Sequence, residues 1–218
     1  MSALPRFLAF YATLFAAFGV ASPFFPSLLQ QDGIGPTQLG VVLGAGTAIR
    51  LLAGPVCGRL ADRTGNVAIT LAGFTAASAV VAFGYAPARG FLLLLAISIV
   101  HAIALAPLTP LADALTLGAA ETGRGFRYGW VRGTGSAAFV VGALASGQVV
   151  GWAGLGAIIW LNGGLLVVAA CVAWLLPNRV AGAHRDSVAV AARASAWSLA
   201  RIPTFVQLMG FAAMMALR

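Results

Sequence analysis

The sequence contains very few charged residues and no lysine. Charged residues make up 8% of its 218 residues, whereas hydrophobic residues make up 61%. A soluble domain carries roughly a quarter charged residues. So little charge excludes an ordinary water-soluble domain and indicates an integral membrane protein.

Residues that bind metals or act as nucleophiles are equally scarce. The two cysteines, Cys57 and Cys171, lie in apolar runs, where they are interpreted as small apolar helix residues. The two histidines are His101, within an apolar run, and His184, in a polar stretch. We interpret His101 as a hydrogen-bond donor between helices rather than as a proton carrier. The sequence shows no metal-ligand spacing, nucleophile elbow or phosphate loop, so we expect no enzyme activity, no metal and no cofactor.

Long apolar runs dominate what is present. A helix needs about 20 residues to cross a bilayer, and helices satisfy their own backbone groups there. A β-barrel would show short alternating segments instead. Six runs are long enough: Phe7–Leu29, Leu39–Gly58, Val67–Ala86, Phe91–Leu111, Gly133–Val150 and Leu155–Leu176. The fold class expected is therefore all-α, a polytopic six-helix transmembrane bundle.

The net charge of +8 comes from arginines, and most of them fall in segments on one side of the membrane. With the N-terminus in the cytoplasm, Arg89 is the only one that falls clearly outside. The cytoplasmic arginines are Arg6, Arg59, Arg63, Arg124, Arg127, Arg179, Arg185, Arg193 and Arg201. This distribution obeys the positive-inside rule. We therefore expect a multi-pass protein of the cell (inner) membrane with a cytoplasmic N-terminus, and no nucleic-acid partner.

A weak internal repeat is visible. The first span carries "PFFP" from Pro23 to Pro26, and the fourth carries "PLTP" from Pro107 to Pro110. Three spans separate the two motifs, so their helices run in opposite directions. Secondary transporters are often built from inverted three-helix repeats. Two such short matches could also arise by chance.

The stretch "GRLADRTG", Gly58 to Gly65, follows the second span. Its glycines allow a tight turn, and one interpretation is an ordinary charged cytoplasmic turn. The stretch also resembles the signature G-x-L-A-D-R-x-G-R-[RK] of the major facilitator superfamily, although Asn66 stands where a basic residue is usual. The matching residues are Gly58, Leu60, Ala61, Asp62, Arg63 and Gly65. The resemblance implies a gating loop that locks the inward-closed state, with Asp62 contacting the other half of the transporter.

Three further stretches, "PFFP", "PLADAL" and "YGWVRGTGSAAF", resemble the lactose-permease and phenylpropionate-permease branch of that superfamily. The resemblance implies that Asp113 and Arg132 form a charged pair in the substrate cavity. Helical spacing places Arg132, Ser136 and Phe139 on one stripe. Phe139 stands where lactose permease has a tryptophan that stacks on sugar, so specificity for galactosides is in doubt.

Two alternatives stay open for the charged pair. Asp113 and Arg132 could be only a structural tie between adjacent helices near the cytoplasmic surface, and Arg50, deeper in the second span, is a rival partner for Asp113. We therefore count Arg50 with the substrate or coupling residues. The fifth span lacks the G-x-x-x-G-P pattern of drug:proton exchangers, which favours import by proton symport over efflux. Its glycines in "GSAAFVVG", Gly135 to Gly142, and its Gly147–Gly151 pair are typical of helix packing.

The domain organisation expected is a transmembrane bundle over residues 1–176, a cytoplasmic linker over 177–204 and the start of a seventh helix over 205–218. The linker has the pattern of a short surface helix around Ser187–Leu199, and "SLARIPTF" resembles the start of a second transporter half. We expect the N-terminal half of a proton-coupled symporter for a small polar or aromatic organic solute, working by alternating access. Its expected partners are that solute, protons, the lipid bilayer and the missing C-terminal six-helix half. The alternatives are an efflux antiporter of the same superfamily and a six-helix membrane assembly protein without transport.

Overall fold

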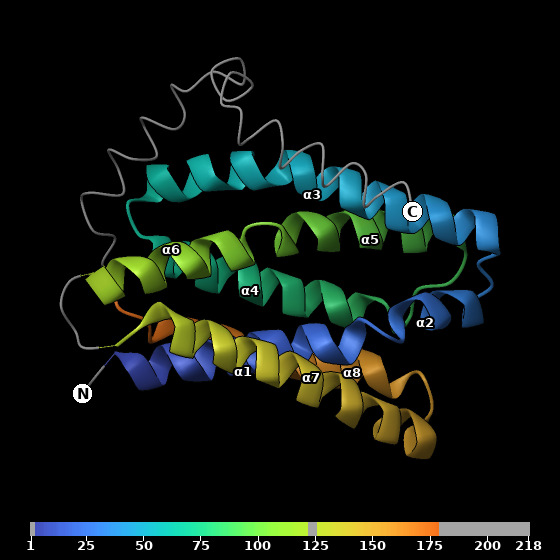
Figure 1. Cartoon of the computed structure of the whole chain (residues 1–218). Coiled ribbons are helices and arrows are strands. Elements are labelled where there is room, and N and C mark those ends of the chain that lie inside the picture. Colours follow the sequence, from blue (N-terminus) through green and yellow to red (C-terminus); the bar gives the residue numbers. More distant parts are fainter. Residues whose placement is uncertain (1–2, 122–125, 179–218) are drawn as a thin grey trace, which may run out of the picture. The chain divides into compact units, whose positions relative to one another are not determined.

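The computed structural model describes residues 3–121 and 126–178, which form a helical bundle (Figure 1). No strand occurs within these ranges. The expected surface helix around Ser187–Leu199, nearly all of the linker and the start of a seventh helix lie outside the described residues. The helices are α1 (Leu4–Ala21), α2 (Phe25–Gln31), α3 (Pro36–Thr64), α4 (Val67–Gly84), α5 (Phe91–Leu105), α6 (Leu108–Glu121), α7 (Tyr128–Ala153) and α8 (Ala157–Trp174).

Five segments of the described chain are long and apolar enough to cross a membrane: Leu4–Ala21, Val67–Gly84, Phe91–Ala120, Tyr128–Ala153 and Ala157–Trp174. The helix α3 has 29 residues, so it spans about 43 Å at 1.5 Å per residue and is also long enough. It differs from the others in carrying Arg50, Arg59, Asp62 and Arg63. The expectation of an all-α, multi-pass membrane protein is confirmed.

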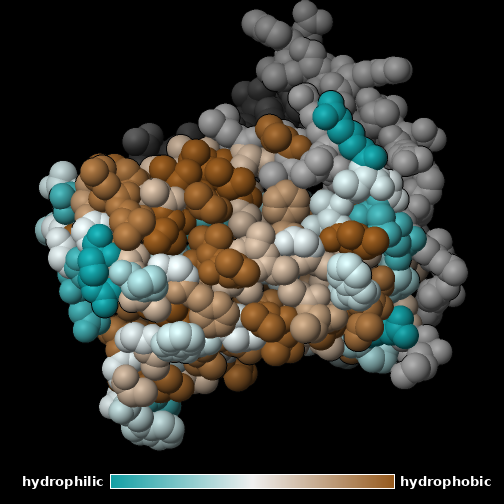
Figure 2. All heavy atoms as spheres, turned by 180° about the vertical axis from the view of Figure 1, so that it is seen from behind, coloured by the Kyte–Doolittle hydropathy of each residue, from teal (hydrophilic) through white to brown (hydrophobic). Residues whose placement is uncertain are grey.

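Exposed large apolar side chains occur on α3, α4, α5, α7 and α8. Figure 2 shows one face on which hydrophobic residues cover most of the middle and hydrophilic residues gather toward two opposite ends. Water would penalise such a surface, whereas lipid tails cover it at no cost. The most exposed of these side chains are Leu51, Val80, Leu92, Trp130, Leu144, Trp152 and Trp174.

Both proline motifs break a helix, which corrects the expectation of two continuous spans. In the first, α1 ends at Ala21 and α2 begins at Phe25, with Pro26 in its first turn. In the second, α5 ends at Leu105 and α6 begins at Leu108, directly after Pro107. Proline lacks a backbone donor and disfavours helical geometry in the residue before it. The breaks therefore follow from the sequence, and they occur in corresponding spans.

The "GRLADRTG" stretch is mostly helix, so its expected loop structure is wrong. The helix α3 continues through Thr64, and Gly65 then takes the left-handed conformation (φ +64°) that ends it. The next residue, Asn66, caps α4 by accepting a hydrogen bond from the Ile69 N–H at 3.1 Å. No proline interrupts residues 58–64, and glycine supplies the left-handed conformation at a helix end most cheaply.

Two more helices extend beyond their expected bounds. The expected fourth span ends at Leu111, but α6 continues to Glu121, and α7 begins at Tyr128 rather than at Gly133. As a result, Asp113 and Arg132 lie inside helices rather than at their edges.

The packing of the helices has the pattern of an inverted repeat. The helix α1 packs against α7 and α8, while α5 packs against α3 and α4, and α4 packs against α8 (Figure 1). When α1–α4 are matched with α5–α8 so that the proline breaks correspond, the contact of α1 with α7 corresponds to that of α5 with α3. The α1–α8 contact corresponds likewise to the α5–α4 contact. Such pairing is expected of two three-helix repeats related by a pseudo-two-fold axis.

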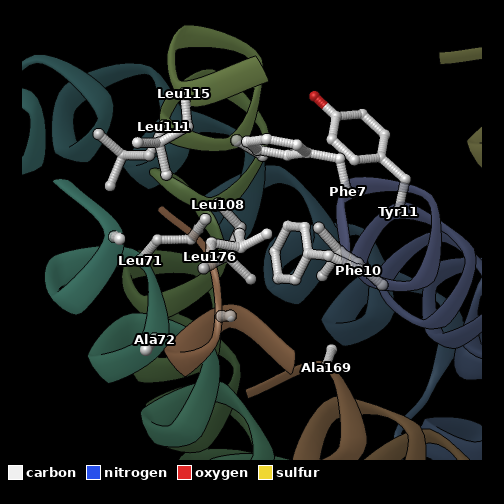
Figure 3. Close-up of a cluster of buried hydrophobic side chains, with 14 of the residues drawn as sticks. Phe7, Phe10, Tyr11, Leu71, Ala72, Leu108, Leu111, Leu115, Ala169 and Leu176 are labelled. Carbon is white, nitrogen blue, oxygen red and sulfur yellow. The ribbon is translucent and has the colours of Figure 1, made fainter. Parts of the chain in front are cut away.

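Two clusters of buried apolar side chains fill the bundle. One joins α1, α4, α6 and α8, and Figure 3 shows Phe7 and Phe10 of α1 near Leu108 and Leu111 of α6. The other includes Leu28, Val42, Tyr85 and Leu94 and joins the opposite ends of the helices. The first proline break lies between Phe10 of one cluster and Leu28 of the other, and the second lies between Leu94 and Leu108.

The helices α1 and α7 cross with their backbones in contact. A Cβ atom at Gly142 would lie 2.5 Å from the carbonyl oxygen of Ala16, and one at Gly19 would overlap the carbonyl oxygen of Phe139. The expected packing role is therefore confirmed for "GSAAFVVG", whereas a Cβ at Gly147 or Gly151 would meet nothing within 4 Å among the described atoms. Glycines therefore permit this helix crossing at Gly19 and Gly142.

Replacing Gly142 by alanine should destabilise the bundle, because the added methyl group meets backbone that cannot rotate away. Overpacking of this kind costs about 1–3 kcal/mol. We expect Gly142→Ala to lower the thermal unfolding temperature in detergent, while the matched control Gly147→Ala leaves it nearly unchanged. Equal unfolding temperatures for the two variants would contradict the proposed crossing.

Candidate functional site

The structure brings Asp113 of α6 and Arg132 of α7 together. An Nη1 atom of Arg132 lies 3.4 Å from Oδ1 of Asp113, and the two side chains are 40% and 27% exposed. The charges are therefore only partly withdrawn from the surface. A lone charge at the centre of a bilayer costs on the order of 3 kcal/mol, and pairing reduces that cost.

A buried tyrosine joins this ion pair to a third helix. The hydroxyl of Tyr11, on α1, donates to Oδ1 of Asp113 at 2.5 Å and lies 3.4 Å from Oγ1 of Thr116. The guanidinium of Arg132 lies over the ring of Phe15, 4.9 Å from its centroid. That ring in turn stacks on Tyr11, with 5.6 Å between ring centroids. The carboxylate of Asp113 is therefore the centre of a network that ties α1, α6 and α7 together.

A cavity of about 550 Å³ lies beside both proline breaks. Its lining includes Ser22 and Pro26 at the first break and Ala106 and Thr109 at the second. Helices α3, α5, α7 and α8, together with Tyr85 directly after α4, complete the wall. Broken helices beside a cavity are typical of substrate sites in secondary transporters, because freed backbone groups can face a ligand or water there.

The expected substrate or coupling residues do not share one site, because some belong to the network around Asp113 and others to the cavity. Arg50 and Phe139 line the cavity, whereas Asp113 and Arg132 do not. The rival pairing of Arg50 with Asp113 is wrong, because the ion pair that the structure shows is between Asp113 and Arg132. Ser136 is exposed and donates to the carbonyl of Arg132 at 3.3 Å. Arg132, Ser136 and Phe139 therefore do not face one common site.

Several polar residues that the sequence did not point to line the cavity. The hydroxyl of Tyr85 donates to Oγ of Ser98 at 3.1 Å, and Nδ2 of Asn162 donates to the carbonyl of Ala17 at 2.8 Å. His101 lies beside Tyr85, with 5.6 Å between ring centroids. Its Nε2 atom is buried and has no hydrogen-bond partner in the described structure, so this atom does not make the bond between helices that was expected of His101.

The expected gating motif lies at the C-terminal end of α3. Gly65 ends the helix, and its carbonyl accepts a hydrogen bond from Asn178, beyond the end of α8, at 3.3 Å. Arg63 is exposed in the last turn, where a cation interacts favourably with the helix dipole. The side chain of Asp62 and the surroundings of Gly58 lie outside what the structure describes.

A second ion pair lies at the other end of the bundle. An Nη1 atom of Arg89 lies 3.3 Å from Oδ1 of Asp32, and the arginine side chain is 66% exposed. It joins the turn after α2 to the turn before α5. The Asp32 side chain is only 16% exposed, but a pair with so exposed an arginine contributes at most about 1 kcal/mol, so it serves as a control for the Asp113–Arg132 pair.

Replacing Tyr11 by phenylalanine should weaken the three-helix network, because Asp113 loses a hydrogen bond from a buried donor. A hydrogen bond to a charged group contributes about 1.5–3 kcal/mol. We expect Tyr11→Phe to lower the unfolding temperature in detergent clearly. The matched control is Thr13→Val, because the Thr13 hydroxyl bonds to carbonyls of its own helix. An unfolding temperature for Tyr11→Phe that equals the control's would show that the network contributes no stability.

Comparisons with known proteins place the chain among transporters. The model of the family described as "MFS_1 like family" matches residues 4–217. The "Probable 3-phenylpropionic acid transporter" of Escherichia coli (strain K12) is 32% identical over 151 residues, which are 66% of this chain and 38% of that protein. The "Maltose permease" of Geobacillus stearothermophilus is 26% identical over 178 residues, which are 81% of this chain and 45% of that protein. The chain therefore spans less than half the length of these relatives.

Proposed function

This chain belongs to the MFS_1 like family, within the major facilitator superfamily, and on that premise we propose that it forms one half of a proton-coupled symporter. The symporter would import a small polar or aromatic organic solute by alternating access. The relatives named above are transporters rather than enzymes. The observation that carries the proposal is the network around Asp113, which holds two opposite charges between α6 and α7.

The cost of this network favours a functional role over a purely structural tie. Replacing a partly buried ion pair by apolar residues is often neutral or stabilising. Charged residues within membrane helices more often mark a substrate or ion pathway. Arg132 remains 40% exposed, so a solute or water can reach it without breaking the helix contact.

A second six-helix half would complete the pathway. The helix α7 packs against α1 on one face, but it leaves Trp130, Val141 and Leu144 exposed on others. Part of that exposed surface suits contact with another helical half as well as with lipid. The lengths of the relatives support the same proposal, because this chain spans 38% of one and 45% of the other.

The chemistry of the cavity favours a solute with an apolar, aromatic-sized body. Phe18, Phe25 and Phe139 contribute rings to a wall that also carries polar groups. A volume of about 550 Å³ lies within the usual range of about 300–1,000 Å³ for small-molecule sites. The relatives' names mention one aromatic acid and one sugar, and the three rings favour the aromatic acid.

Neutralising either member of the charged pair should abolish transport in the complete two-half protein. Asp113→Ala and Arg132→Ala each leave one charge uncompensated, so we expect uptake of radiolabelled 3-phenylpropionate to fall by at least tenfold. If the pair acts on solute or protons, the double variant should reach the membrane yet stay inactive. The control Arg89→Gln removes the exposed ion pair and should keep uptake near normal.

Near-normal uptake in the double variant would show that Asp113 and Arg132 serve only as a structural tie between the helices. Solute uptake without acidification of the vesicle interior, measured with a pH indicator inside the vesicles, would contradict proton symport. Export of the solute driven by an inward proton gradient, without import, would favour the efflux alternative instead.

A gating role for Asp62 predicts a different kinetic signature. The residue lies near the C-terminal end of α3, far along the helix from the cavity-lining residues Thr47 and Arg50. We expect Asp62→Asn to slow uptake several-fold while the dissociation constant of the solute changes less than twofold. Loss of solute binding with an unchanged rate of conformational exchange would contradict this role.

A further inference from the structure

The cavity at the helix breaks contains a cation that has no carboxylate partner among the described side chains. Arg50 lines this cavity together with Tyr85 and His101. The two carboxylates whose side chains the structure describes are already engaged, Asp32 with Arg89 and Asp113 with Arg132. Arg50 is exposed, and the rest of the cavity wall is mostly apolar, so its positive charge is open to a ligand and has no compensating carboxylate among the described side chains.

A second unmatched group lies in the same wall. His101 is 9% exposed, and its Nε2 atom has no hydrogen-bond partner in the described structure. Native proteins leave few buried polar atoms unpaired, and each one calls for an explanation such as an absent ligand. The neutral imidazole can carry its proton on Nε2 and then donates a hydrogen bond from that atom.

The two unmatched groups require the same kind of partner. A guanidinium offers paired N–H donors that fit a carboxylate, and an imidazole N–H adds a further donor. The neighbouring hydroxyl of Tyr85 already donates to Ser98, so it does not compete for the role. Phe18, Phe25 and Phe139 add apolar residues to the same cavity lining.

We propose that this cavity binds an organic monocarboxylate, with the carboxylate held by Arg50 and Nε2–H of His101 and the apolar body packed against Phe18, Phe25 and Phe139. This inference rests on the proposed transport function and names the part of the solute that the chain recognises. The Asp113–Arg132 pair lies outside the cavity, so it is not part of this carboxylate site.

The inference predicts that charge, rather than shape, decides which solutes bind. A carboxamide has nearly the same shape as a carboxylate but no negative charge, so it leaves Arg50 uncompensated. Hydrogen bonds to charged groups are about twice as strong as neutral ones. Phenylacetate and 4-phenylbutanoate should therefore bind at least tenfold more tightly than phenylacetamide and 4-phenylbutanamide.

The test measures binding of these four compounds to the purified, complete two-half transporter by isothermal titration calorimetry. Arg50→Gln should remove the preference for the acids while changing amide binding less than about twofold, and Arg50→Lys should restore part of it. His101→Phe should weaken the acids several-fold. The control Arg89→Gln, an arginine outside this cavity, should keep the full preference.

Comparison of the acids with the amides on the unaltered protein needs no variant, so a misfolded variant cannot hide the answer. Equal binding of acids and amides, binding of neither, or an acid preference that survives Arg50→Gln overturns the carboxylate site. Transport of a neutral solute would then leave the proposed function standing. Conversely, an acid preference that depends on Arg50, without any uptake into vesicles, supports the site and contradicts the transport function.

Discussion

The bilayer supplies no hydrogen-bond partners, and this constraint explains most of the described structure. Backbone groups are satisfied within helices, and most polar side chains find partners inside the bundle. Thr75 and Ser78 donate to carbonyls of their own helix, and Asn162 donates to the backbone of α1. The carboxylate of Asp113 accepts from Tyr11 and pairs with Arg132. Against this background, Arg50 and Nε2 of His101, two cavity groups without a partner among the described side chains, point to a ligand.

The two proline breaks connect the fold to that cavity. Each break interrupts the first helix of a repeat, and the cavity lies beside both. The close crossing of α1 and α7 at Gly19 and Gly142 holds the first break against the second repeat. A rigid bundle on one side of a site and broken helices within it suit a transporter in which one half moves against another.

The sequence predicted the class, order and approximate positions of the helices, because lipid requires long apolar segments with few charges. It misplaced several ends for local reasons. The helix α3 runs on to Thr64 because only Gly65 adopts the left-handed conformation that stops it. The charged ends of α6 and α7 are helical because charge at a water-facing end does not oppose helix formation.

The site was predictable only where charge gave a signal. Asp113 and Arg132 stood out as rare charges beside apolar runs, and the structure places them together. Tyr11, Tyr85, Ser98 and Asn162 carry no such signal, because uncharged polar residues are common in membrane helices. They meet their partners through contacts between different helices, and helix spacing within one span cannot reveal those contacts.

The most direct test of this account asks whether the cavity contains water in the membrane. Cysteine would be placed at Thr47 or Ser22, which line the cavity, and at Val80, which is 71% exposed on α4, after Cys57 and Cys171 are replaced by alanine. Reaction with a water-soluble, membrane-impermeant thiol reagent would be measured in intact cells and in inverted vesicles. We expect rapid labelling at positions 47 and 22 from at least one side, slowed by added phenylacetate, and no labelling at position 80. Equal labelling at all three positions, or labelling at position 80 alone, would contradict a solvent-filled transport cavity at the helix breaks.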